Sequence, residues 1–155
     1  MLVGLISDTH GQLRPEVFDR FAAVDRILHA GDIGSVELLL ELEAIAPVTA
    51  VWGNTDGFDV RARVAETAEA VLDGCRVVVV HGHQLGSPRP DSLREAYPEA
   101  DVIVYGHTHR ADVDRADGRW VVNPGAAGPA RFRLRPSVAL MTVERASVDV
   151  RIVEL

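Results

Sequence analysis

Residues 101–109 have the sequence DVIVYGHTH, a pattern that predicts both a strand and a site at its end. The apolar run 102–105 is short, rich in β-branched residues and bounded by Gly106, which is typical of a fully buried strand. His107 and His109 come next. In an extended backbone, side chains two positions apart point to the same side, so these two imidazoles are predicted to converge just beyond the strand. Ligands of open α/β sheets bind at that edge.

Two histidines after one strand can also be ordinary polar residues in a solvated turn. The same arrangement, however, recurs after four other predicted strands, at residues 1–6, 25–29, 48–52 and 76–80. Asp, Asn and Gly are common turn residues, but five strand ends that all carry ligand-type side chains predict a shared site. In chain order these side chains are Asp8, His10, Asp32, Asn54, His81, His107 and His109.

The order of predicted elements changes half-way along the chain. The first half alternates strands with helices, whose beginnings are marked by Pro15 and Ser35. The second half consists mostly of hairpins with Asp-Gly turns, the first of which joins residues 64–72 to 76–80. Two sheets packed face to face would reconcile the halves. We therefore expect an α/β (α+β) fold, a four-layer αββα sandwich of two mixed β-sheets with flanking helices, formed by a single domain over residues 1–155.

Composition excludes several other classes of protein. With 155 residues, of which 47% are hydrophobic, the chain can bury a substantial core. The net charge of −7 argues against a long nucleic acid as partner. Cys75 is the only cysteine, so it is expected to be a small core residue in a protein of the reducing cytoplasm. No signal peptide or apolar span of membrane length is evident, so no membrane partner is expected.

The predicted ligands suit a pair of metal ions. Imidazoles and carboxylates without thiolates favour Mn, Fe, Zn, Ni or Co. Seven ligands are too many for one tetrahedral ion but suit two ions about 3.5–4 Å apart that share a carboxylate. Two divalent ions with Asp8 and Asp32 would leave a net charge of about +2, which suits a phosphate oxygen. The expected reaction is in-line attack on phosphorus by a hydroxide bound to the two metals.

These motifs resemble those of the calcineurin-like metallophosphoesterases, and the short chain with its Gly-Asn-Thr-Asp segment is similar to their small bacterial and archaeal phosphodiesterase branch. The motifs are DTH at 8–10, GD at 31–32, GN at 53–54, HGH at 81–83 and GHTH at 106–109. The resemblance implies a dinuclear centre with Mn²⁺ as the usual activator. One ion would be held by Asp8, His10, Asp32 and His109. The other would be held by Asp32, Asn54, His81 and His107, with Asp32 bridging.

One position departs from the pattern of the larger family members. There a His follows the motif Asn54 and assists phosphate binding and protonation of the leaving group, whereas here the next residue is Thr55. His83 or Asp56 could take over the protonation, although a hydrogen bond that orients a metal ligand is the ordinary alternative for His83. The expected catalytic residues are Asp32, Asn54 and His83.

Three further groups of residues have weaker expectations. Arg131, Arg133 and Arg135 alternate, so they are predicted to share one face of an extended segment and to form a solvated rim. Arg131 is a candidate substrate contact, together with Asn54 and Thr55. His29 is expected to be a hydrogen-bonded core residue, and Trp52 to lie in the core.

The sequence thus predicts a metal-dependent phosphodiesterase that acts on a small phosphodiester, with two Mn²⁺ ions or with Ni²⁺, Co²⁺, Fe²⁺ or Zn²⁺ in their place. One alternative is a protein-interaction scaffold that retains the fold, since the scaffold subunit of retromer resembles this family. A phosphomonoesterase or nuclease of the same family is the other alternative. Assembly into a homo-oligomer is left open.

Overall fold

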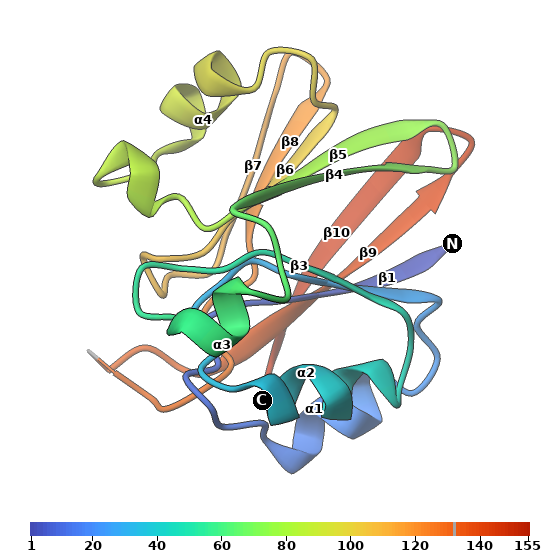
Figure 1. Ribbon diagram of the computed structural model, residues 1–155. Helices are drawn as coiled ribbons and strands as arrows, with labels where there is room; N and C mark the ends of the chain where they lie inside the picture. Colours follow the sequence, from blue (N-terminus) through green and yellow to red (C-terminus); the bar gives the residue numbers. More distant parts are fainter. Residues whose placement is uncertain (132) are drawn as a thin grey trace.

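The computed structural model describes residues 1–131 and 133–155, which form two five-stranded β-sheets packed face to face (Figure 1). The strands of the first sheet follow the order β10 (Ser147–Glu154), β9 (Ser137–Glu144), β1 (Leu2–Ile6), β2 (Arg26–His29) and β3 (Val48–Ala50). Those of the second sheet follow the order β4 (Thr67–Leu72), β5 (Cys75–Val80), β6 (Val102–Val104), β8 (Arg119–Asn123) and β7 (Asp112–Ala116). The expected sandwich of two mixed sheets is confirmed.

Each sheet combines parallel and antiparallel pairs. In the first sheet β1, β2 and β3 are parallel, and β9 and β10 extend it with antiparallel pairs. In the second sheet β5, β6 and β8 are parallel, and β4 and β7 are antiparallel at its two edges. The parallel strands of each sheet therefore bring their carboxyl ends to the same edge, where the predicted site residues follow.

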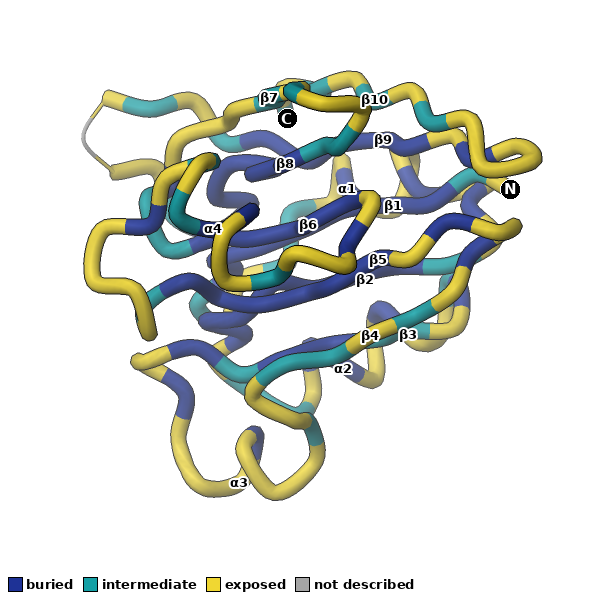
Figure 2. Tube along the Cα trace, turned by 90° about the horizontal axis from the view of Figure 1, so that it is seen from above, coloured by how far each residue is buried: buried dark blue, intermediate teal, exposed yellow. Residues whose placement is uncertain are grey.

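Three hydrophobic cores separate four layers. The central core lies between the sheets and contains Leu5 and Val104. Helices α1 (Pro15–Arg20) and α2 (Val36–Glu43) cover the outer face of the first sheet, with Phe21 buried beneath them. Helix α4 (Pro90–Ala96) covers the second sheet through Leu93. Figure 2 shows buried residues along the middle strands of both sheets. Among the described residues, no helix is long and apolar enough to cross a membrane.

Local signals in the sequence account for several of these boundaries. The hydroxyl of Ser35 accepts a hydrogen bond from the N–H of Leu38 at 3.3 Å, which caps α2 as predicted. The hairpin of β4 and β5 turns at Asp73 and Gly74, with φ angles of +46° and +83°. Positive φ at both central residues is what a type I′ hairpin turn requires.

Two local predictions are wrong. A short helix, α3 (Phe58–Arg61), precedes the hairpin, and β4 begins at Thr67 rather than at residue 64. The N–H of Val64 donates to the carbonyl of Val60 at 3.2 Å, so this segment continues the helical turn and cannot join the ladder. The strand predicted over residues 48–52 is also shorter, since β3 ends at Ala50.

Candidate metal centre

The seven predicted ligands lie in loops that follow five of the parallel strands, three in the first sheet and two in the second (Figure 1). Asp8 and His10 follow β1, Asp32 follows β2, Asn54 follows β3, His81 follows β5, and His107 and His109 follow β6. The loops of the two sheets meet, because Nδ1 of His81 lies 2.7 Å from the carbonyl oxygen of Ala30, just beyond β2. Residues from distant parts of the chain are thus brought to one place.

One compact group consists of Asp8, His10 and His109. Nε2 of His109 lies 3.3 Å from Oδ1 of Asp8 and 3.4 Å from Nε2 of His10. Asp8 is fully buried and His109 is 9% exposed, whereas His10 lies at the boundary with solvent. Three potential ligand atoms therefore face one another in a nearly closed space.

The second compact group consists of Asp8, Asp32 and His81. Nε2 of His81 lies 3.3 Å from Oδ2 of Asp32, 3.9 Å from Oδ1 of Asp8 and 3.1 Å from Oδ1 of Asn54. Nδ1–H of His81 donates to a backbone carbonyl, so Nε2 is the nitrogen that faces the carboxylates. Oδ2 of Asp32 also lies 3.9 Å from Nε2 of His10, which places this oxygen between the two groups.

The two histidines after β6 are arranged differently from the prediction. His107 and His109 have φ angles of +70° and +61°, so the expectation of an extended backbone is wrong. Both residues have left-handed backbone, and the ring of His109 lies beside that of His10, with centroids 5.3 Å apart. The ring of His107 packs edge-on against that of His81, with centroids 5.2 Å apart. The backbone N–H of His107 donates to Oδ2 of Asp8 at 3.2 Å. The ring nitrogens of His107 belong to neither compact group.

Left-handed backbone is concentrated at this site. Ten described residues other than glycine have positive φ. Five of these are Asp8, His10, Asp32, His107 and His109. Such conformations cost roughly 1 kcal/mol or more for each residue, and they persist where function requires an unusual direction of the side chain.

Two glycines permit the close approach of the loops. A Cβ atom on Gly53 would collide with the carboxylate and backbone nitrogen of Asp32. A Cβ on Gly106 would collide with the hydroxyl of Ser7 and would lie 2.6 Å from Oδ2 of Asp8. The glycines of the GN and GHTH motifs are therefore explained by the space that the two carboxylates occupy.

The second group forms a strong charge pair within the protein. The pKa of Asp32 lies below its usual range, and the pKa of His81 lies above its usual value. Burial, the largest influence on each group, opposes both shifts. It is outweighed by the hydrogen bond between the two side chains, by the N–H of Thr55 on Asp32 and by the charge of Asp8 acting on His81. A cation that binds here replaces the His81 proton as partner of the carboxylates.

The carboxylate of Asp8 fits a metal cation. Its Oδ1 atom is buried and has no hydrogen-bond partner in the described part of the chain, although buried polar atoms are nearly always paired. This oxygen faces Nε2 of both His109 and His81. Imidazole nitrogens around a buried carboxylate oxygen without a hydrogen-bond partner match the preferences of divalent first-row metals.

The carboxylate of Asp56 is held by backbone hydrogen bonds, which contradicts its suggested role as a proton donor. Its buried carboxylate accepts hydrogen bonds from the backbone N–H groups of Ile33, Gly34 and Gly53, at 2.8–3.1 Å. These bonds join the loops after β2 and β3. Thr55, beside it, is exposed, and its N–H donates to Oδ1 of Asp32 at 3.0 Å.

His83 lies beside the two groups, in contact with residues that the sequence did not indicate. Its ring centroid is 5.4 Å from that of His81 and 5.6 Å from that of Trp52. Trp52 is half-buried rather than fully in the core, and the guanidinium of Arg61 lies 4.2 Å above its ring. Arg61 also donates to the carbonyl oxygens of Asp56 and Asn54. It therefore supports the loop that carries Asn54, but nothing in its sequence context predicts this contact.

The structure confirms the prediction for His29 but not the extended backbone predicted around Arg131, Arg133 and Arg135. His29 is fully buried, with both ring nitrogens paired, to the hydroxyl of Thr9 at 2.9 Å and to the N–H of Gly31 at 3.1 Å, so the prediction of a satisfied core histidine is confirmed. The described residues of the segment with the alternating arginines, 131 and 133–135, are not in a strand, and Arg133 lies in a turn with φ of +59°. Arg131 is exposed and adjoins His109 in the wall of a small hollow.

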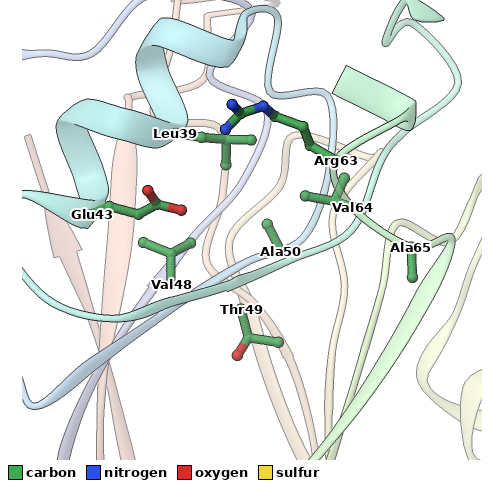
Figure 3. Close-up of a pocket in the computed structure, with 8 residues that line it drawn as sticks. All are labelled: Leu39, Glu43, Val48, Thr49, Ala50, Arg63, Val64 and Ala65. Atoms are coloured by element: carbon green, nitrogen blue, oxygen red, sulfur yellow. The ribbon is translucent and has the colours of Figure 1, made fainter. Parts of the chain in front are cut away.

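A separate hollow of about 360 Å³ lies between α2, the edge strand β3 and residues 63–65 (Figure 3). Leu39, Val48 and Val64 contribute to its wall, and the charged side chains of Glu43 and Arg63 flank it. None of its lining residues belongs to the predicted ligands. The metal centre is thus distinct from this surface depression.

Residues 1–146 match the model of the calcineurin-like phosphoesterase superfamily domain. The chain belongs to this family. A probable metallophosphoesterase of Methanothermobacter thermautotrophicus is 36% identical, and the match covers 99% of this chain and 92% of the relative. These findings agree with the resemblance inferred from the motifs.

Two solved structures have the same fold. An archaeal phosphodiesterase superposes with a TM-score of 0.76 and 25% identity, and the match covers 99% of this chain and all of the other. A single mutant of Vps29 from Entamoeba histolytica superposes with a TM-score of 0.80 and 25% identity, over all of this chain and 99% of the other. The chain is thus a member of a phosphoesterase family and has candidate metal-ligand groups of its own. The same fold also occurs in Vps29.

Proposed function

We propose that this protein is a metal-dependent phosphodiesterase of the cytoplasm, acting as a single domain with two divalent ions, Mn²⁺ foremost. The observation that carries this proposal is Oδ1 of Asp8, buried and unpaired between the imidazoles of His109 and His81. In a member of the phosphoesterase family, such an oxygen is best explained as a metal ligand.

The ligands are proposed in two sets that share one carboxylate. Asp8, His10, Asp32 and His109 hold the first ion in this proposal. Asp32, Asn54, His81 and His107 hold the second. Support for Asp32 as the shared ligand comes from its Oδ2 atom, which lies between His10 and His81.

When bound, the ions supply positive charge that lowers the pKa of a coordinated water and polarises the phosphoryl oxygens. The chain's own residues provide the orientation. The carbonyl of Ala30 fixes the tautomer of His81, and the N–H of Thr55 holds Asp32 in place. Fixed ligands need little reorganisation during the reaction, which is how preorganised sites lower a barrier.

The remaining residues are proposed to contact the substrate. Asn54 and Thr55 are exposed at the edge of the centre and can donate hydrogen bonds to a phosphoryl oxygen. Arg131 lies close enough to His10 for its charge to act on that ring, so it can reach an anionic substrate at the same side. His83, beside His81 and His107, is the proposed hydrogen-bond donor to the leaving-group oxygen.

A small phosphodiester is the proposed substrate, rather than a monoester. Support comes from the archaeal phosphodiesterase of the same fold and from a phosphodiesterase of Methanocaldococcus jannaschii that is 28% identical over 81% of this chain. The acidic net charge of −7 disfavours a long nucleic acid.

The decisive experiment compares a diester with a monoester. The protein is stripped of metal and assayed with bis-p-nitrophenyl phosphate and with p-nitrophenyl phosphate, each with and without Mn²⁺. We expect Mn²⁺ to restore turnover, with preference for the diester. Preference for the monoester would retain the metal centre but contradict the proposed substrate class.

A second candidate function is that of a protein-interaction scaffold, as the similarity to Vps29 suggests. Phe58 on α3 is 88% exposed and Val71 on β4 is 71% exposed, and a contact surface could use these apolar side chains. Absence of turnover with Mn²⁺, Ni²⁺, Co²⁺ and Zn²⁺ would favour this candidate over the enzyme.

A further inference from the structure

A hollow of about 340 Å³ opens beside the candidate metal centre, and its volume lies within the usual range of ligand pockets. The turn after β6 and the segment before β9 form most of its wall. The polar residues in this wall are His109, Arg110, Arg133, Arg135, Ser137 and Glu154. The hollow contains none of the substrate contacts proposed above.

The wall of this hollow is strongly cationic. Three of its residues are arginines and one, Glu154, is acidic. Glu154 is already paired with Arg135, at 2.9 Å. Within the described residues, Arg110 and Arg133 form no ion pair with a carboxylate. Two unneutralised guanidinium groups at one hollow are unusual for a chain with a net charge of −7.

The hollow adjoins the metal centre directly. His109 contributes to the wall of the hollow, and its Nε2 atom faces Oδ1 of Asp8 at 3.3 Å. His109 is thus shared by the hollow and the candidate metal centre.

We propose that this hollow is an oxyanion subsite for the substrate, a proposal that rests on the function proposed above. One ester arm of the phosphodiester would carry a second phosphate or a carboxylate, which Arg110 and Arg133 would bind. A guanidinium presents its N–H donors as a planar fork that matches both of these anions. Apolar or cationic arms would leave the two charges without a partner, so the subsite selects diesters that bear an additional negative charge.

The first test measures anion binding separately from catalysis. Inorganic phosphate is titrated calorimetrically into the metal-free protein, in which buried carboxylates would repel the anion from the centre itself. We expect binding at one site, and an affinity lower by about tenfold or more in the Arg110→Gln/Arg133→Gln variant. Arg20→Gln, at an exposed position of α1, is the matched control and should bind phosphate as the wild type does.

The second test uses two chromogenic diesters in the Mn²⁺-loaded protein. Both carry a p-nitrophenyl ester, and the other arm is either methyl or 2-phosphoethyl. We expect the wild type and Arg20→Gln to prefer the phosphoethyl substrate through a lower KM. The double glutamine variant should lose this preference, and Arg110→Lys/Arg133→Lys should recover part of it because the charge returns without the fork.

The outcomes separate the two proposals. Equal phosphate binding by the wild type and the double glutamine variant, or none by the wild type, would overturn the subsite. So would equal preference for the phosphoethyl substrate in both proteins. Phosphate binding that depends on the two arginines would support the anion site even if the protein hydrolyses no diester. Absence of diester hydrolysis would refute only the proposed phosphodiesterase activity.

Discussion

Nε2 of His81 lies 3.3 Å from Oδ2 of Asp32, and this contact joins the two sheets at the candidate metal centre. His81 follows β5 of the second sheet, and Asp32 follows β2 of the first. When His81 is protonated, its Nε2 proton lies between the imidazole and this carboxylate. A metal ion that takes the same two ligands must displace this proton.

The first prediction is that metal binding releases a proton from His81. The carboxylates of Asp32 and Asp8 outweigh the effect of burial and raise the pKa of His81, so its ring binds a proton more tightly than a free imidazole does. Affinity for Mn²⁺ should therefore fall as the pH decreases through this pKa. Calorimetric titrations in buffers with different ionisation enthalpies measure the protons released. An observed enthalpy that does not vary with the buffer would contradict the prediction.

The second prediction contrasts two buried carboxylates. Asp32→Asn should weaken Mn²⁺ binding and diester hydrolysis by about a hundredfold or more, because it removes the charge of the shared ligand. Asp56→Asn should instead lower the free energy of unfolding by about 1–3 kcal/mol, since its amide cannot accept all three backbone hydrogen bonds. Metal titrations and urea unfolding of both variants distinguish the roles. Full Mn²⁺-dependent turnover by Asp32→Asn would refute the proposed centre.

The third prediction concerns thermal stability. A metal ion that binds only the folded state raises Tm, so Mn²⁺ should raise it by roughly 5–10 °C at a hundredfold excess over Kd for a chain of this size. In Asp8→Asn this increase should largely disappear. Calorimetric melting curves check both effects, and a Tm that excess Mn²⁺ leaves unchanged would count against the centre.

The positions of the seven candidate ligands could be predicted from the sequence because each of them directly follows a buried parallel strand. Such strands are recognisable as short β-branched runs, and topology alone places their carboxyl ends at one edge. The backbone of the loops could not be predicted in the same way. His107 and His109 adopt left-handed conformations, which only the packing of the surrounding loops selects.

The wrong predictions involve contacts between distant segments. The position of Asp56 close to Asn54 in the sequence suggests a proton donor. In the fold its carboxylate accepts hydrogen bonds from N–H groups of another loop, and no local sequence pattern indicates these bonds. Arg61 and Trp52 stack because the short helix α3 returns toward β3. A helix of four residues has too few positions to show helical periodicity, so it escaped prediction.

The fourth prediction concerns His29 and the acid stability of the metal-free protein. Burial lowers the pKa of His29 to about 4, from about 6.5 in an unfolded chain, although the charges of Asp56 and Asp8 oppose this shift. Above pH 6.5 the ring is neutral in both states and has no effect. Between about pH 6.5 and 4 only the unfolded chain binds the proton, so the free energy of unfolding should decrease by about 3 kcal/mol in total.

His29→Asn isolates this contribution from those of the other histidines. Oδ1 of the new side chain can still accept from the N–H of Gly31, whereas the contact with Thr9 is lost. The variant should therefore be less stable than the wild type at pH 7.5 but lose less stability on acidification, so that the two curves approach each other toward pH 4.5. Urea unfolding at intervals across this range measures the difference. Parallel curves would mean that His29 becomes protonated equally in the folded and unfolded states.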